Sequence, residues 1–127
     1  MTEEKLRIGC IGAGVLGSAI MRRLIECAHA PRLWNRDRSK LAGLLAAGGR
    51  AAETPAALAR ECDFIITCVS DGAAMERVVF AEHGVAEAGS AGKVLIDMST
   101  CAATQTRDMA RRLAQQCGMA WLDAPIS

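Results

Sequence analysis

Apolar and polar positions follow one another along this chain in a pattern that predicts strands separated by helices. A nearly continuous apolar run over residues 6–11 is typical of a strand that is buried on both faces. The segment after it, residues 15–27, repeats apolar side chains every three to four positions, as an amphipathic helix does. Its predicted apolar stripe consists of Leu16, Ile20, Leu24 and Cys27, with Met21 and Ile25 beside it. Further short apolar runs predict strands over residues 32–35, 50–52, 64–69, 94–96 and 119–122.

Residues typical of helix ends separate these runs. Ser39, Thr54 and Asp71 are expected N-caps, because their side-chain oxygens can accept a hydrogen bond from the first helical turn. Met109 and Leu113 define a longer helix before the last strand, and Gly118 is expected to end it.

The first predicted strand ends in a glycine pattern, Gly12-Ala13-Gly14-Val15-Leu16-Gly17, of the form G-x-G-x-x-G. Gly12 permits a tight strand-to-helix turn, Gly14 lets a pyrophosphate approach the backbone, and Gly17 lets the helix lie close to the strand. The pattern alone is common by chance, but here a strand precedes it and a helix follows it. It therefore indicates a dinucleotide site at the start of the first helix.

Strands that alternate with helices require right-handed crossovers and a parallel sheet. With the glycine pattern on the first turn, the expected fold class is α/β, a Rossmann doubly wound parallel sheet with strand order 3-2-1-4-5-6. No internal linker or low-complexity segment interrupts the pattern, so residues 1–127 are expected to form one domain. Ligands bind such sheets at the carboxyl ends of the strands.

Composition excludes several other classes. The net charge is +1 and no long run of one sign occurs, so nothing indicates nucleic acid or an anionic membrane as partner. No apolar stretch approaches the roughly 20 residues that a membrane crossing needs. Residues 1–5 lack the features of a signal peptide, and the expected location is cytoplasmic. Six cysteines without C-x-x-C spacing, and two distant histidines, favour reduced thiols and no metal site.

The end of the second predicted strand favours NADP(H) over NAD(H). NAD-preferring proteins usually carry Asp or Glu there, which binds the ribose hydroxyls. Here the strand ends in Asn35 followed by Arg36, whose guanidinium can stack on adenine and bind a 2′-phosphate. Arg38 and Lys40 add positive charge, which Asp37 partly offsets.

Two further segments, at the ends of the fifth and sixth predicted strands, carry a resemblance to a known family. The segments are Asp97-Met98-Ser99-Thr100 and Leu122-Asp123-Ala124-Pro125-Ile126-Ser127. Together with the glycine pattern and Asn35-Arg36, they make the chain resemble the N-terminal cofactor domain of the β-hydroxyacid dehydrogenases, which include 3-hydroxyisobutyrate dehydrogenase and tartronate semialdehyde reductase. 6-Phosphogluconate dehydrogenase and the imine reductases are relatives of that family.

The resemblance implies roles for matching positions. The glycine-rich turn holds the pyrophosphate, and the residues at the end of the second strand hold the adenosine. The implied cofactor-binding residues are Gly12, Gly14, Val15, Leu16, Gly17, Asn35, Arg36, Val69, Ser70 and Thr100. Ser127 matches a serine that binds the substrate. Ser70, Ser99 and Thr100 can also serve ordinary turns and caps, and Asp97 and Asp123 are expected to tie down turns.

No catalytic residue is expected within this chain. The family's lysine acid/base lies beyond the position of Ser127, and so does the helical domain that closes the active site and forms the homo-oligomer. Lys5 and Lys93 are expected at the amino-terminal edge of the sheet, away from the ligand, and Lys40 is expected near the adenosine. None of the three can therefore reach a substrate beside the nicotinamide. The resemblance thus implies the cofactor half of an NADP(H)-dependent oxidoreductase that acts on a small 3-hydroxy acid or its semialdehyde or keto partner.

Two alternatives stay open, and a third is disfavoured. The chain could be a dinucleotide-binding or redox-sensing module without a reaction of its own. It could belong to an imine reductase, although Asp97–Thr100 and Asp123–Ser127 favour hydroxy acids. A flavin or S-adenosylmethionine domain also uses a glycine-rich first turn, but the later segments do not fit one.

Overall fold

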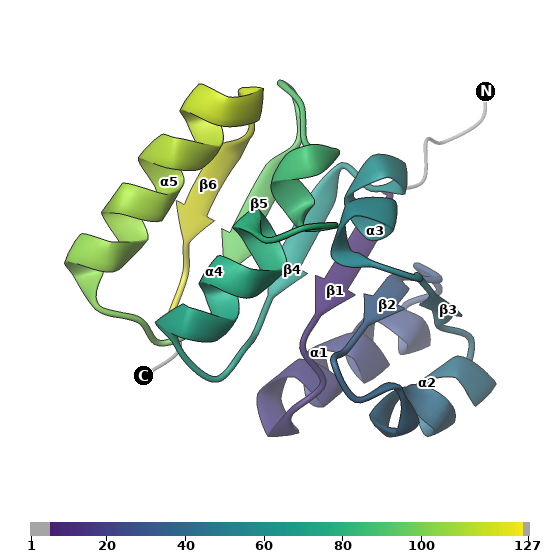
Figure 1. Ribbon diagram of the computed structural model, residues 1–127. Helices are drawn as coiled ribbons and strands as arrows, with labels where there is room; N and C mark the ends of the chain where they lie inside the picture. Colours follow the sequence, from purple (N-terminus) through teal and green to yellow (C-terminus); the bar gives the residue numbers. More distant parts are fainter. Residues whose placement is uncertain (1–5, 126–127) are drawn as a thin grey trace.

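A computed structural model of the chain describes residues 6–125 and contains the predicted parallel sheet, with order β3-β2-β1-β4-β5-β6. All strand pairs are parallel, and their carboxyl ends lie along one edge (Figure 1). The strands are β1 (Ile8–Ile11), β2 (Arg32–Trp34), β3 (Arg50–Ala51), β4 (Phe64–Thr67), β5 (Val94–Asp97) and β6 (Ala120–Asp123). The α-helices are α1 (Val15–Glu26), α2 (Ala42–Ala46), α3 (Pro55–Glu61), α4 (Gly72–Phe80) and α5 (Ala103–Cys117).

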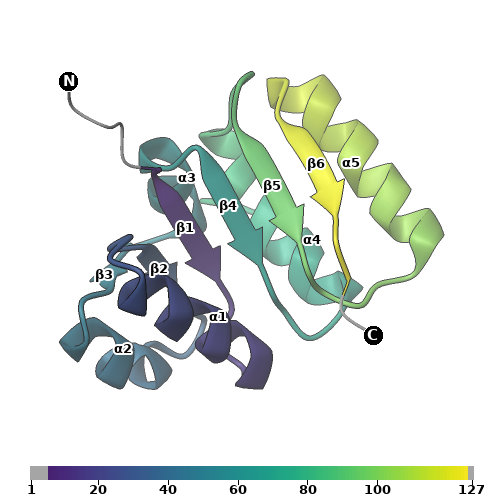
Figure 2. The ribbon, with the colours of Figure 1, turned by 180° about the vertical axis from the view of Figure 1, so that it is seen from behind.

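Helices cover the two faces of the sheet unequally. Met21 of α1 and Leu44 of α2 pack on one face, and Leu58, Met75 and Met109 of α3, α4 and α5 pack on the other. In Figure 2 no helix lies in front of β5 and β6. Accordingly, Leu122 of β6 keeps 53% of its surface exposed. The larger core therefore lies between the sheet and helices α3 to α5.

Two predicted helix caps are confirmed. Thr54 Oγ1 accepts a hydrogen bond from the Ala57 N–H at 3.0 Å, and Asp71 Oδ1 accepts one from the Ala74 N–H at 2.8 Å. At the other end of the chain, Gly118 ends α5 in the left-handed conformation with φ of 78°. These residues fix where α3 and α4 begin and where α5 ends.

The predicted cap at Ser39 is wrong. Asp37 performs this role, because its Oδ1 accepts hydrogen bonds from the Ser39 N–H at 3.0 Å and the Ser39 hydroxyl at 2.6 Å. A short 3-10 turn, η1 (Arg38–Leu41), begins there and leads into α2. The carboxylate lies just beyond the end of β2, so the turn starts two residues earlier than the apolar pattern indicates.

The buried side of α1 also differs from the predicted stripe of Leu16, Ile20, Leu24 and Cys27. The buried residues are Gly17 and Met21, while Cys27 is exposed at the helix end. Gly17 has no side chain to hold the helix away, so this line of α1 lies against the sheet and the longer apolar side chains flank it. A hydrophobicity pattern gives a glycine little weight and therefore misplaces the contact line.

All six cysteines are unpaired in the structure. Burial raises the pKa of the Cys10 thiol to about 12 and that of the Cys62 thiol to about 11. Both thiols therefore stay protonated at neutral pH and pack as small apolar side chains.

Candidate functional site

The turn between β1 and α1 depends on two glycines that leave no room for a side chain. Gly12 has φ of 104°, and a Cβ atom on it would lie 2.1 Å from the Cys68 carbonyl oxygen. A Cβ on Gly17 would lie 1.9 Å from the Gly12 carbonyl oxygen. The backbones of the turn, of α1 and of the segment after β4 are therefore packed directly against one another.

Gly14 differs from these two glycines. A Cβ on it would meet nothing within 4 Å, so space beside its backbone is open. Gly14 is the N-cap of α1, and no side chain caps that helix, whereas side chains cap α3 and α4. Ser18 is the first residue of α1 whose N–H bonds back, to the Gly14 carbonyl at 2.8 Å. The N–H groups of the first turn are thus free to bind an anion such as a pyrophosphate.

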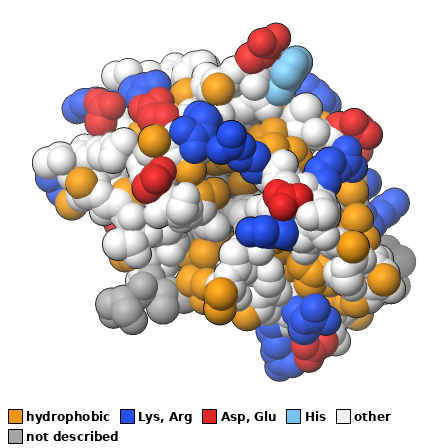
Figure 3. Space-filling view, turned by 60° about the horizontal axis from the view of Figure 1, so that its bottom comes forward, with side chains coloured by type: hydrophobic (Ala, Val, Ile, Leu, Met, Phe, Trp, Pro, Cys, Tyr) orange, Lys and Arg blue, Asp and Glu red, His pale blue; other side chains and the backbone are white. Residues whose placement is uncertain are grey.

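The residues that carry these N–H groups line a cleft of about 890 Å³ at the carboxyl ends of the strands. We call it the carboxyl-edge cleft. In Figure 3, which brings this edge forward, Lys and Arg side chains surround a hollow with an apolar floor. Nine of the predicted cofactor residues line the cleft: Gly12, Gly14, Val15, Leu16, Gly17, Asn35, Arg36, Val69 and Ser70. Thr100 is exposed and does not line it, and Ser127 lies outside the described residues.

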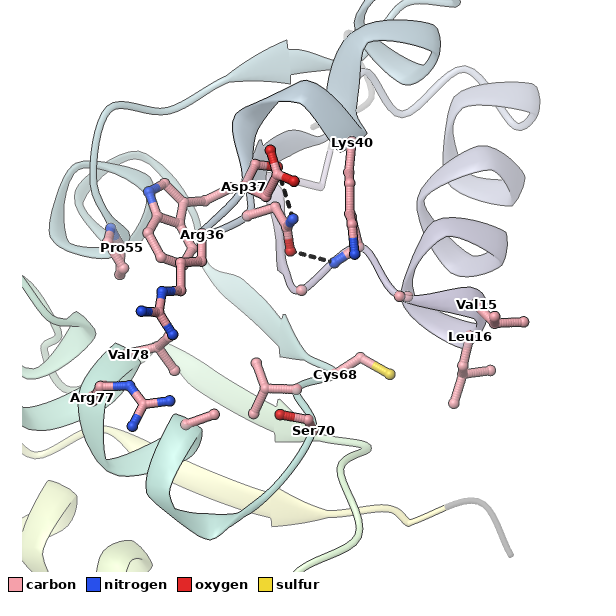
Figure 4. A pocket seen from close by; sticks show the side chains of 18 of the residues that line it. Val15, Leu16, Arg36, Asp37, Lys40, Pro55, Cys68, Ser70, Arg77 and Val78 are labelled. Carbon is pink, nitrogen blue, oxygen red and sulfur yellow. Dashed lines mark hydrogen bonds between the residues drawn. The ribbon is translucent and has the colours of Figure 1, made fainter.

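Val15 stands out at the mouth of this cleft because its apolar side chain is 96% exposed. Figure 4 shows Val15 and Leu16 projecting from the first turn of α1, away from the residues at the β2 end. Exposed apolar side chains beside free N–H groups suit a ligand with a flat ring next to its phosphates.

Asn35 connects the glycine-rich turn to the segment after β2. Its Oδ1 accepts a hydrogen bond from the Ala13 N–H, and its Nδ2 donates one to the Asp37 carbonyl oxygen, both at 2.8 Å (Figure 4). The side chain thus holds the glycine-rich turn against the end of β2. Each polar group of the Asn35 amide thus makes one hydrogen bond to the protein's own backbone, and its contact with adenosine stays a prediction.

Charged side chains gather at the β2 end of the carboxyl-edge cleft. Arg36, Lys40 and Arg77 line it together with Asp37 and Glu82. The side chain of Asp37 is engaged by Ser39, which lowers the pKa of its carboxyl group and keeps it ionised. Neither Arg36 nor Arg77 forms an ion pair with another described residue. This end of the cleft can therefore attract a phosphate or an electron-rich ring.

Sequence reasoning missed the contribution of α4. Arg77 and Val78 of this helix line the cleft, as does Pro55 at the start of α3. The periodicity of α4 predicts that Met75, Val78 and Val79 pack in the core, and all three are buried, but it does not reveal which element the rest of the helix faces. The only signal was the position of α4 directly after the carboxyl end of β4, which neighbours β1.

A buried hydrogen-bond chain supports the other end of the cleft. Asp97 at the end of β5 is fully buried, and its Oδ1 accepts hydrogen bonds from the Thr67 hydroxyl at 3.1 Å and the Ser99 N–H at 2.9 Å. The Ser99 hydroxyl in turn accepts one from the Val69 N–H at 2.9 Å. Asp97 therefore ties down its turn as predicted, and through Ser99 it positions the segment after β4.

Asp97 should make stability depend on pH. Burial, with a contribution from Asp123, raises the pKa of the Asp97 carboxyl above its ordinary value, although the hydrogen bonds from Ser99 and Thr67 oppose the shift. The unfolded chain then loses this proton at a lower pH than the folded one, so stability falls as pH rises from about 4 through the raised pKa. Asp97→Asn cannot titrate, and its Oδ1 still accepts both bonds.

The measurement is urea unfolding of both proteins between pH 4 and pH 7. The free energy of unfolding of the wild type, minus that of the Asp97→Asn variant, should decrease as pH rises. The carboxyl groups that do not interact with Asp97 titrate equally in the two proteins and cancel. A difference that stays constant over this range would show that Asp97 does not carry the predicted shift.

The lysines occupy the predicted edges of the sheet, as far as the structure describes them. Lys93 Nζ donates hydrogen bonds to the carbonyl oxygens of Ala59 and Cys62, each at 2.7 Å, and of Arg60 at 3.3 Å, at the end of α3. This is the edge opposite the cleft. Lys40 lines the cleft at its Arg36 end, and Lys5 lies outside the described residues.

These positions predict opposite effects for two lysine substitutions. Lys93→Met removes the donor for three carbonyl groups and should lower the free energy of unfolding by about 1–2 kcal/mol. The Lys93→Met variant should bind a dinucleotide with the affinity of the wild type. Lys40→Met should leave stability unchanged and weaken NADPH binding. Thermal unfolding with and without NADPH checks both, and a loss of ligand affinity in Lys93→Met would contradict the assignment.

Between residues 6 and 125, no three His, Cys, Asp or Glu side chains lie together as metal ligands would. None of the helices in that range combines the length and the apolar character that crossing a membrane requires.

Comparison with known proteins gives a consistent family assignment. A family model for the NAD-binding domain of 6-phosphogluconate dehydrogenase matches residues 7–127. Among curated proteins, the chain is 33% identical over 127 residues to the cytokine-like nuclear factor N-PAC of Homo sapiens. It covers 23% of that protein, so it spans about a quarter of the length of this relative.

Solved structures resemble the chain over nearly all of its length. Psf3 in complex with NADP+ and 2-OPP has a TM-score of 0.88 and 29% identity, covering 94% of this chain and 42% of that one. Imine reductase from Myxococcus stipitatus in complex with NADP+ has a TM-score of 0.82 and 25% identity, covering 92% of this chain and 39% of that one.

Proposed function

Because the chain belongs to the family of the NAD-binding domain of 6-phosphogluconate dehydrogenase, we propose that it binds NADP(H) in the carboxyl-edge cleft. One observation carries the proposal: the uncapped first turn of α1 beside the open space at Gly14, with Arg36 and Lys40 at the end of the same cleft. The free N–H groups match a pyrophosphate, and the cations match a 2′-phosphate.

In this proposal the cofactor-binding residues have distinct roles. Gly12, Gly14, Val15, Leu16 and Gly17 form the pyrophosphate turn, and Asn35 fixes that turn in place through the Ala13 N–H. Arg36 binds the adenosine end. Val69 and Ser70 lie under the nicotinamide ribose, with Thr100 near the nicotinamide. The bound cofactor supplies the hydride, and the protein orients it.

The reaction we propose for the whole protein is hydride transfer between the nicotinamide and a small 3-hydroxy acid, or its semialdehyde or keto partner. The segments Asp97–Thr100 and Asp123–Ser127 support this substrate class through their resemblance to the β-hydroxyacid dehydrogenases. Ser127 contacts the substrate in this proposal, while a second, helical domain supplies the lysine acid/base and the contacts of a homo-oligomer.

Calorimetric titration of the chain with NADPH, NADH, FAD and S-adenosylmethionine tests the cofactor. We expect NADPH to bind most tightly, NADH more weakly, and the other two ligands not at all. Equal affinities for NADPH and NADH would refute the preference, and binding of FAD or S-adenosylmethionine alone would refute the dinucleotide site. Screening the whole protein with short hydroxy acids and semialdehydes, by the NADPH absorbance change, tests the reaction.

A second candidate is a dinucleotide-binding module without a reaction. Of the two lysines within residues 6–125, Lys93 lies at the edge opposite the cleft and Lys40 lines the cleft together with Arg36, and the N-PAC relatives are named as nuclear factors. This candidate predicts tight NADPH binding and no turnover of any hydroxy acid by the whole protein. An imine reductase parent, supported by the similarity to the Myxococcus stipitatus enzyme, predicts NADPH oxidation with imines instead.

A further inference from the structure

Arg77 has no task in the proposed function, although it lies in the same cleft. It is in the second turn of α4, its side chain is exposed, and it makes no side-chain hydrogen bond or ion pair with the residues that the structure describes. The carboxylate of the neighbouring Glu76 forms an ion pair with the Arg112 guanidinium and not with Arg77. Arg77 is therefore not needed to hold α4 in place.

Arg77 and Arg36 approach the same space from opposite walls. Figure 4 shows Arg36 extending from the end of β2 and Arg77 from α4, with both guanidinium groups directed toward the region beside Val78. Pro55 and Val78 make this region apolar. Two guanidinium groups that form no ion pair and lie beside an apolar surface repel each other, and an electron-rich ligand between them reduces that repulsion.

A flat aromatic ring fits this arrangement better than a second phosphate does. Guanidinium planes stack on aromatic rings, and cation–π attraction grows where apolar side chains exclude water. The 2′-phosphate belongs at the tip of β2, beside Arg36 and Lys40, because the ribose hydroxyls of a dinucleotide lie there. Arg77 is on the opposite wall with Val78, where the adenine ring would extend.

We propose that Arg77 binds the adenine ring of the dinucleotide from the α4 wall, opposite Arg36. This inference rests on the proposed function, because it assumes that a dinucleotide occupies the cleft. Arg77 then contributes to the affinity for every adenine nucleotide and does not select between NADP(H) and NAD(H), a task that remains with Arg36 and Lys40. Glu82 lies at the same end of the cleft and limits the net positive charge there.

The test compares Arg77→Gln, Arg77→Lys and a control, Arg60→Gln. Arg60 is exposed at the end of α3, on the opposite edge of the sheet beside Lys93, and its substitution changes the net charge equally. Calorimetry with NADPH, NADH, 5′-ADP and inorganic pyrophosphate separates the adenine from the phosphates. Thermal unfolding without ligand should be the same for all variants.

In Arg77→Gln, the affinities for NADPH, NADH and 5′-ADP should each fall about 3- to 10-fold, with that for pyrophosphate unchanged. Arg77→Lys should recover only part of the loss, and Arg60→Gln should match the wild type. Unchanged ADP binding in Arg77→Gln, a loss confined to NADPH, or full recovery with lysine would each overturn the inference while the proposed function stands. Failure of the wild type to bind any of the nucleotides would instead overturn the proposed function.

Discussion

Gly17→Ala is expected to lower the unfolding temperature by roughly 10 °C, which corresponds to a loss of about 3 kcal/mol for a domain of this size. The added Cβ would lie 1.9 Å from the Gly12 carbonyl oxygen and 2.9 Å from its carbon, both backbone atoms. Since neither can rotate away as a side-chain tip can, α1 must move from β1. That displacement opens the contact in which Gly17 and Met21 are buried.

The same substitution should also abolish detectable dinucleotide binding, because the shifted helix moves the free N–H groups away from the proposed position of the pyrophosphate. Differential scanning calorimetry of the free protein, and titration with NADPH, measure the two effects separately.

Gly14→Ala is the matched control, with the opposite pattern expected. Gly14 has φ of −72°, which alanine adopts readily, and its Cβ would meet no atom within 4 Å. Stability should therefore change by less than about 1 kcal/mol, the usual cost of alanine at an N-cap. NADPH binding should fall about tenfold or more, since the methyl group occupies the space through which a pyrophosphate would approach. If Gly14→Ala bound NADPH like the wild type, the proposed position of the pyrophosphate would be wrong.

The features that could be predicted from the sequence are those with a local cause. Thr54 and Asp71 cap helices because a side-chain oxygen stands three residues before an N–H group that needs an acceptor. The strand order follows from alternating strands and helices together with a glycine turn after the first strand. Each of these needs only a few neighbouring residues to be recognised.

What the sequence did not reveal depends on contacts between distant segments. The Val69 N–H binds the hydroxyl of Ser99, 30 residues away, and the amide of Asn35 binds the Ala13 N–H, 22 residues away. Such bonds require the finished sheet, which brings the ends of β1, β2, β4 and β5 to one edge. Arg77 was missed for the same reason, because its spacing on α4 resembles that of any solvated arginine.

Asn35 and Arg36 are adjacent in the sequence, yet the structure separates their tasks. Asn35 is occupied by the backbone, whereas Arg36 is exposed in the cleft without an ion pair. Preference for NADP(H) should therefore depend on Arg36 far more than on Asn35. Asp37 would be the natural competitor for this guanidinium, but its carboxylate is turned to Ser39.

Arg36→Asp should consequently weaken NADPH binding about 100-fold, because a carboxylate would replace a cation a few ångströms from a phosphate with nearly two negative charges. NADH lacks that phosphate, so its affinity should fall only a few-fold, through the lost stacking on adenine. The variant should thus prefer NADH, which thermal-shift titration with the two cofactors measures directly.

Arg38→Asp is the control for this prediction, since it makes the same change in charge two residues along the chain, at an exposed position that does not line the cleft. It should reduce NADPH affinity only slightly. The reduction should be smaller at higher salt, because dissolved ions screen the interaction between a solvent-exposed charge and the cofactor. Equal losses in the two variants would mean that overall charge attracts the cofactor and that no guanidinium contacts its 2′-phosphate. If NADPH raised the unfolding temperature of Arg36→Asp as much as that of the wild type, the adenosine end of the cofactor would not lie beside β2 as proposed.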